Sequence, residues 1–119
     1  MTKWVEVTDL GYLMRRKKQR VTVEGQDIAL FYVAGQVFAL NDVCVHKGRH
    51  LSRGLVFQGT VICPGHQWAF DLKTGWVDEW SKCQPTYEVK VESEKVYVNP
   101  EPHQYSTRPD DSERFQPEE

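Results

Sequence analysis

Long apolar runs are missing from this sequence. No run approaches the ~20 apolar residues that cross a bilayer, and residues 1–10 lack the apolar stretch of a secretory signal peptide. Only three cysteines are present, an odd number whose spacing does not suggest a disulfide framework. A net charge of −2 gives no reason to expect binding to nucleic acid or to a membrane. We therefore expect a cytoplasmic protein in a reducing compartment.

A sustained helical pattern is also missing. No segment repeats its apolar residues with a period of 3.6, and residues 9–14 could form one helical turn at most. Short alternating or apolar runs separated by turn residues fill the chain instead, and they predict an all-β fold. The expected strands lie at 4–7, 20–24, 28–33, 37–40, 55–57, 60–63, 68–72, 87–92 and 95–98.

The length of 119 residues is enough for one domain and too short for a large multi-cofactor enzyme. Residues 1–98 carry 13 Lys and Arg against 11 Asp and Glu, whereas residues 99–119 carry two against six. The second segment also holds four prolines and few apolar residues. We therefore expect one domain over 1–98, followed over 99–119 by an acidic, extended or disordered tail that aids solubility.

Two short segments combine a cysteine with a histidine. The first contains Cys44 and His46, and the second, sixteen residues further on, contains Cys63 and His66. A 2Fe–2S cluster can take two cysteines on one iron and two histidines on the other, so two similar loops could hold it from opposite sides. A zinc site with two cysteines and two histidines is the alternative, although zinc fingers usually keep their cysteines together and their histidines together. Chance placement is the remaining alternative.

The stretches CVHKGRHLSRG and CPGHQWAFDLKTG resemble the two cluster-binding loops of Rieske-type 2Fe–2S proteins. The resemblance extends over residues 4–98 and includes the Phe70-Asp71-x-x-Thr74-Gly75 run after the second loop. It implies an antiparallel β-sandwich with a small cluster-binding tip built from two loops. It also implies one Rieske-type 2Fe–2S cluster, no catalytic residue, and a ligand set for metal and cofactor made of Cys44, His46, Cys63 and His66.

Among Rieske-type proteins, the sequence looks most like the small subunit of assimilatory NAD(P)H nitrite reductase. The loops lack the extra cysteines of respiratory Rieske proteins, and the chain is too short for an oxygenase terminal component. Gln67-Trp68 replaces the Gly-Gly pair of many dioxygenase ferredoxins, and the Cys83–Val89 run is similar to nitrite reductase small subunits. We therefore expect an electron-transfer subunit that partners a large sirohaem- and flavin-containing subunit. The alternative is a soluble Rieske ferredoxin that serves an aromatic-ring dioxygenase.

Some residues outside the ligand set also carry expectations. We expect a partly buried free thiol at Cys83 and an indole at Trp68 that shields the cluster from water. A basic rim beside the first loop could contact an acidic partner surface, or it could be solvated. The rim consists of Lys47, Arg49, His50 and Arg53.

Overall fold

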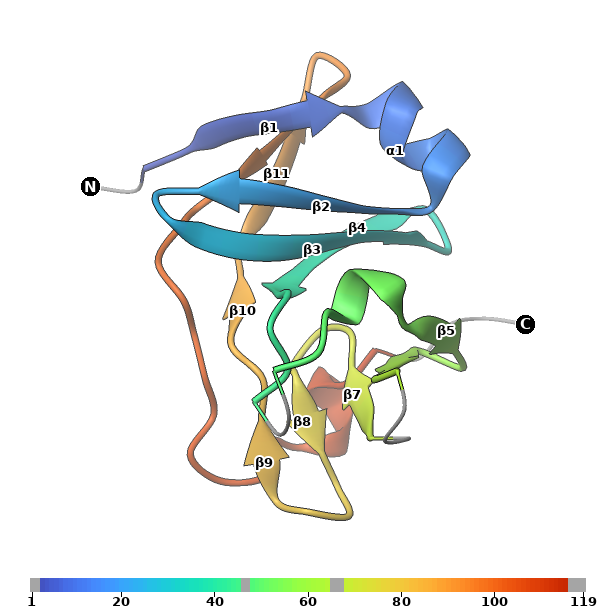
Figure 1. The fold of residues 1–119 in the computed structure, drawn as a ribbon, viewed down its shortest axis with the longest axis vertical. Coiled ribbons are helices and arrows are strands. Elements are labelled where there is room, and N and C mark those ends of the chain that lie inside the picture. Colours follow the sequence, from blue (N-terminus) through green and yellow to red (C-terminus); the bar gives the residue numbers. More distant parts are fainter. Residues whose placement is uncertain (1–2, 46–47, 65–67, 116–119) are drawn as a thin grey trace.

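A computed structural model of the chain describes residues 3–45, 48–64 and 68–115 and has an all-β fold (Figure 1). The upper half in this view is a sandwich, and the lower half is a smaller unit that carries both predicted loops. Its elements are β1 (Val5–Asp9), α1 (Leu10–Arg16), β2 (Lys18–Val23), β3 (Gln26–Val33), β4 (Gln36–Asn41), η1 (Leu51–Arg53), β5 (Leu55–Phe57), β6 (Thr60–Ile62), β7 (Ala69–Asp71), β8 (Trp76–Val77), β9 (Lys82–Cys83), β10 (Thr86–Tyr87), β11 (Val89–Glu92), β12 (Lys95–Val98) and η2 (Asp111–Glu113).

The upper half pairs two antiparallel sheets, one ordered β1-β12-β11 and the other β10-β4-β3-β2. Strand β3 lies between two apolar clusters because its side chains alternate between the two faces of the sheet. Ile28 and Leu30 pack in the upper cluster with Leu13 of α1, while Ala29 and Phe31 pack in the lower cluster. The continuous apolar run of β3 therefore reflects burial on both faces.

The helix α1 is longer than the expected single turn. It runs from Leu10 to Arg16, and Leu13 is its fully buried residue. It ends at Lys17, which adopts a left-handed conformation with φ of 72° and donates its N–H to the Leu13 carbonyl at 2.7 Å. The apolar pattern of this segment predicts a helix only weakly, because a single buried leucine anchors a helix this short. Among the described residues, no helix has the length and apolar character of a membrane span.

The lower half consists of a three-stranded sheet ordered β5-β6-β7 and the β8-β9 hairpin (Figure 1). Val61 and Phe70 face each other across β6 and β7, and both are fully buried. Their cluster also contains Cys44 and Cys63, so this core supports the base of both predicted loops. The two halves share β3, because its lower face completes the lower core.

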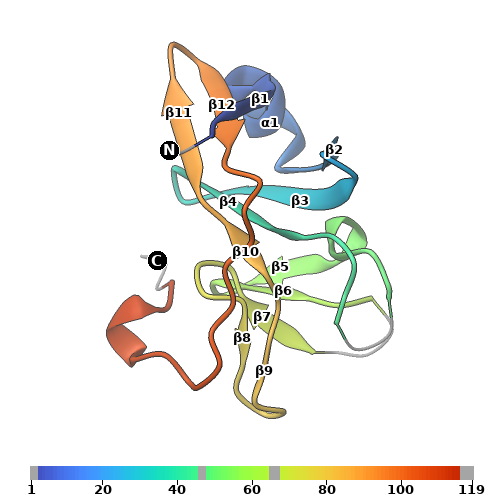
Figure 2. The ribbon, with the colours of Figure 1, turned by 90° about the vertical axis from the view of Figure 1, so that its left-hand side faces the viewer.

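The C-terminal segment differs from the expected solubilising tail. In Figure 2, residues 99–115 run from β12 past β10 to η2, which lies beside β7 and β8. The Phe115 ring is only 7% exposed and packs on Phe38 with ring centroids 4.6 Å apart. Its N–H donates to the buried Asp71 carboxylate at 3.1 Å. The composition of the segment did not indicate this packing, because only Phe115 anchors an otherwise polar stretch, through its ring and its N–H.

Gly75 makes the turn from β7 to β8 and carries the first prediction. It has φ of +79°, and a Cβ there would lie 2.1 Å from the Gln84 carbonyl oxygen. Gly75→Ala should therefore lower the free energy of unfolding by about 1–3 kcal/mol more than the same substitution at a glycine whose added Cβ would have free space around it. Gly35 is the matched control, because it has the same φ and a Cβ there would meet nothing within 4 Å.

Urea unfolding of both variants checks this prediction. Gly35→Ala should lose only the roughly 1–2 kcal/mol that a left-handed conformation costs an L-residue. Equal losses in the two variants would show that the approach of Gly75 to Gln84 contributes nothing.

Candidate metal centre

Loop 1, residues 42–50, connects β4 to η1 and carries Cys44. The Cys44 N–H donates to the Arg49 carbonyl at 2.8 Å, and the Cys44 carbonyl accepts the Gly48 N–H at 2.9 Å. Gly48 has φ of +69°, which suits a residue without a side chain at this bend. These bonds close the loop on the cysteine, whose side chain is 2% exposed.

Loop 2, residues 63–68, connects β6 to β7 and begins at Cys63. The last strand pair before the loop joins Ile62 to Ala69. Beyond it, the Cys63 N–H donates to the Trp68 carbonyl at 2.9 Å and closes the loop at its base. The Cys63 side chain is 1% exposed. Each loop therefore carries, at or near its start, a buried cysteine whose amide is fixed by the main chain.

The two buried cysteines lie next to each other, although nineteen positions separate them in the sequence. They belong to one apolar cluster, and their side chains are joined by a hydrogen bond. Burial raises the pKa of the Cys63 thiol to about 12; the hydrogen bond and charge of Cys44 add to this rise, and Arg49 opposes it. Metal binding at this pair must therefore release protons, because a thiolate is the ligand form. Two adjacent thiols that can bind one iron fit the predicted 2Fe–2S group.

The two histidines predicted as ligands, His46 and His66, lie outside the described residues, as does Lys47 of the basic rim. The structure therefore does not test the complete set of Cys44, His46, Cys63 and His66. Among the residues it describes, no group of three or more His, Cys, Asp or Glu side chains could hold a metal ion.

Asp42 fixes the exit of loop 1 and was not singled out by the sequence. Its side chain is completely buried, and its carboxylate accepts the Ser52 N–H and the His50 Nδ1–H, each at 2.7 Å. Its carbonyl accepts the Leu51 N–H at 2.7 Å. His50 is thus held by a carboxylate and stays partly exposed, whereas Arg49 and Arg53 of the same rim are exposed.

Gln84 is a second residue that the sequence analysis missed. It precedes Pro85 between β9 and β10 and is completely buried. Its side chain hydrogen-bonds to the main chain of loop 1 at Val43 and Val45 and to the last residue of β4, Asn41. A glutamine before a proline carries no recognisable signal in the sequence. Its role becomes visible only when β9 and loop 1 are brought together.

Trp68 is buried, and Cys83 is more deeply buried than the partly buried thiol that we expect from the sequence. Trp68 is 7% exposed, shares the cluster of the two loop cysteines, and stacks on Trp80 with ring centroids 5.4 Å apart. Cys83 is also buried, and burial raises its pKa. Its Sγ donates to the Thr74 carbonyl and accepts the Tyr105 N–H, both at 3.3 Å. Cys83 is therefore part of the contact with the C-terminal segment.

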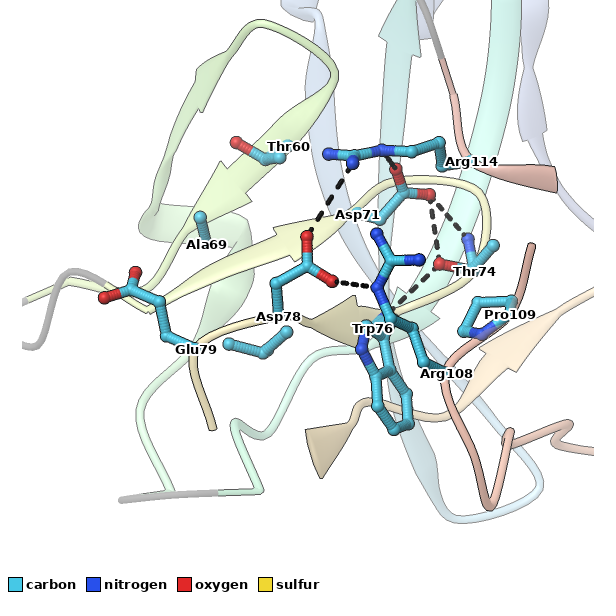
Figure 3. A pocket seen from close by; sticks show the side chains of 11 residues that line it. Thr60, Ala69, Asp71, Thr74, Trp76, Asp78, Glu79, Arg108, Pro109 and Arg114 are labelled. Atoms are coloured by element: carbon cyan, nitrogen blue, oxygen red, sulfur yellow. Dashed lines mark hydrogen bonds and ion pairs between the residues drawn. The ribbon is translucent and has the colours of Figure 1, made fainter. Parts of the chain in front are cut away.

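A cavity of about 290 Å³ lies between β7, β8 and the C-terminal segment (Figure 3). Arg108 donates to Asp78 at 2.9 Å and to Asp111 at 2.8 Å. Arg114 lies 3.9 Å from Asp71 and 3.7 Å from Asp78. These ion pairs join the C-terminal segment to the lower half, and neither loop cysteine lines the cavity.

Comparisons with known proteins identify the fold and the relatives. The family model described as "Rieske [2Fe-2S] domain" matches residues 3–98. The ferredoxin component of the naphthalene 1,2-dioxygenase system of Pseudomonas putida is 33% identical over 103 residues, which cover 82% of this chain and 95% of the relative.

Solved structures give the same picture. One chain from the complex of reduced oxygenase and oxidized ferredoxin in carbazole 1,9a-dioxygenase is 27% identical, with a TM-score of 0.78 over 88% of this chain and 100% of that one. The ferredoxin of carbazole 1,9a-dioxygenase from Nocardioides aromaticivorans IC177 is 23% identical and has a TM-score of 0.77 over 84% of this chain and 100% of that one. The second likeness supports the fold alone.

The expected assignment to a nitrite reductase small subunit is wrong. The relatives that match over nearly their whole length are ferredoxin components of dioxygenase systems, which was the alternative. The residues after His66 and the run from Cys83 to Val89 misled the assignment. The structure suggests a reason for the second run. Gln84 hydrogen-bonds to loop 1, and Cys83 hydrogen-bonds to the C-terminal segment. Such contacts stabilise the fold, and either class of protein could require them.

Proposed function

Because the chain belongs to the Rieske [2Fe-2S] domain family, whose domain binds a 2Fe–2S cluster, we propose that it is an electron-transfer ferredoxin that supplies the terminal oxygenase of an aromatic-ring dioxygenase system. The observation that carries this proposal is the 33% identity to a dioxygenase ferredoxin over 95% of that relative's length. That relative is by its name one component of a multicomponent dioxygenase system, so we expect the oxygenase to be a partner of this chain.

In this proposal Cys44 and Cys63 bind one iron, and His46 and His66 bind the other. The adjacent buried thiols support the cysteine half. When bound, the cluster accepts and releases one electron at a time. The chain itself fixes the two cysteine amides through main-chain hydrogen bonds and excludes water from the thiols with the Trp68 side chain. It contributes no catalytic residue and no substrate site.

The exposed side chains beside loop 1 suggest how a partner is recognised. Arg49, in loop 1, and Arg53, in the η1 turn that follows it, are both exposed to solvent. A partner with an acidic surface would be steered toward this side, and the effect would weaken as salt rises.

We also propose a cytoplasmic location for the protein. The chain would divide at residue 98, and residues 99–115 would pack across the lower half and stabilise it.

The test is direct electron transfer from the reduced, cluster-loaded chain. Mixed in a stopped-flow spectrometer with the oxidised terminal oxygenase of the P. putida naphthalene 1,2-dioxygenase system, the chain should be reoxidised at a rate that depends on oxygenase concentration. The large sirohaem subunit of a nitrite reductase is the control acceptor and should react far more slowly. Faster transfer to the sirohaem subunit would overturn the proposal.

A further inference from the structure

The Gln84 side chain satisfies three main-chain groups around Cys44. Its Oε1 accepts the Val45 N–H at 3.0 Å. Its Nε2 donates to the Val43 carbonyl at 2.7 Å and to the Asn41 carbonyl at 2.6 Å. A primary amide has two N–H donors and a carbonyl oxygen, so one buried side chain holds the residues on both sides of the cysteine.

Gln84 is itself held firmly in place. Its N–H donates to the Gly75 carbonyl at 2.8 Å. The Gln84 carbonyl oxygen also lies close to Gly75: a Cβ added to Gly75 would be only 2.1 Å from that oxygen. Pro85 follows and restricts the backbone conformation of Gln84. The amide therefore projects from a fixed backbone toward loop 1.

The remaining polar groups near Cys44 are bonded within loop 1 or to its neighbours. The Cys44 N–H and carbonyl bond to Arg49 and Gly48, and the Val43 N–H donates to the Asn41 side chain at 3.0 Å. Val45 is the residue between Cys44 and the predicted ligand His46. Its N–H donates to the Gln84 side chain, so this donor already has an acceptor.

We propose that Gln84 is a positioning residue for the cluster: it holds the main chain on both sides of Cys44 and binds the Val45 N–H, which thereby cannot donate to a sulfur atom. The inference rests on the proposed function, because it requires Cys44 to be a cluster ligand. Hydrogen bonds to the sulfur atoms are one of the factors that set the reduction potential of an iron–sulfur cluster. Gln84 thus affects both how tightly the cluster is held and how easily it is reduced.

Two substitutions separate these effects. Gln84→Met keeps a similar volume but leaves the Val45 N–H and two carbonyls without their partner. We expect cluster release to a chelator to become roughly 10–100-fold faster, as for other residues that orient metal ligands. The reduction potential should rise because the Val45 N–H becomes free to donate. Gln84→Glu keeps an oxygen for Val45 and should return the potential toward that of the wild type.

The matched control is Leu13→Ala in the upper cluster, which is also fully buried but lies on the far side of β3 from the cysteines. It should lower the stability of the fold and leave the potential unchanged. All variants are loaded with iron and sulfide, and the potential is measured by redox titration with electron paramagnetic resonance.

The outcomes distinguish this inference from the proposed function. If the wild-type chain binds no cluster, the proposed function fails. If the wild type binds it and Gln84→Met matches the wild type in release rate and potential, the role of Gln84 is wrong. A Leu13→Ala variant with the same shift in potential would also overturn it, because the shift would then follow from lost stability. If Gln84→Met does not fold, the release rate of Gln84→Glu decides, because a glutamate lacks the amide that donates to the Val43 and Asn41 carbonyls. A release rate equal to that of the wild type overturns the role.

Discussion

Cys63→Ser should abolish cluster binding, whereas Cys83→Ser should leave the cluster in place. Both thiols are buried, yet their neighbours differ. Cys63 hydrogen-bonds to Cys44 at the base of the two loops, while Cys83 bonds to Thr74 and Tyr105. A serine hydroxyl is a poor substitute for a thiolate in binding iron, and it can form the hydrogen bonds that Cys83 makes.

Iron and sulfide analysis of the reconstituted variants measures this difference, together with the paramagnetic resonance signal of the reduced protein. The wild type and Cys83→Ser should each hold two irons per chain. Cys63→Ser should retain almost none. If both variants lost the cluster equally, the loss would follow from replacing a buried thiol, and Cys63 would not be identified as an iron ligand.

Phe115→Ala should be the most destabilising single change in the C-terminal segment. Large-to-small substitution of a buried phenylalanine costs about 3–5 kcal/mol. The ring packs on Phe38 in the cluster that also contains both loop cysteines. The loss should therefore reach the metal centre, and the variant should also release its cluster faster than the wild type.

Phe57→Ala is the matched control, because it removes the same side chain from a site that is 55% exposed on β5. It should cost only a fraction of the loss in Phe115→Ala. Urea unfolding of the metal-free proteins measures the two free energies, and a chelator assay measures cluster release. If Phe115→Ala unfolds no more easily than Phe57→Ala, residues 99–115 do not stabilise the lower half.

Local sequence determines much of the strand pattern. Turns fall between the expected strands, and the chain adopts positive φ there, at Ala34-Gly35 and Gln58-Gly59 among others. These turns could be predicted because a glycine at such a position is a local requirement. The burial of β3 on both faces could be predicted because its apolar run is continuous. Helix α1 was underestimated because its stability depends on one buried contact of Leu13.

The sequence also determined which residues are candidates for the cluster. The spacing of Cys44, His46, Cys63 and His66 indicates a two-loop iron–sulfur site without any knowledge of the fold, since each loop must supply one ligand to each iron. The choice between kinds of Rieske protein was wrong because short runs beside the ligands serve structural tasks as well as partner recognition. Relatives compared over the whole domain correct that choice.

Only the tertiary structure shows what holds these loops. Gln84, Asp42 and Phe115 lie in runs of no recognisable motif, and all three are buried. Gln84 and Phe115 bond to groups 39 and 44 positions away, and Asp42 bonds just beyond the other end of its own loop, 10 positions away. A buried polar group must find a partner, and a buried ring must find a cavity of its shape. Which partner and which cavity depend on segments that meet only in the folded chain. Candidate ligands could therefore be proposed from their spacing, whereas the residues that support the two loops could be identified only from the fold.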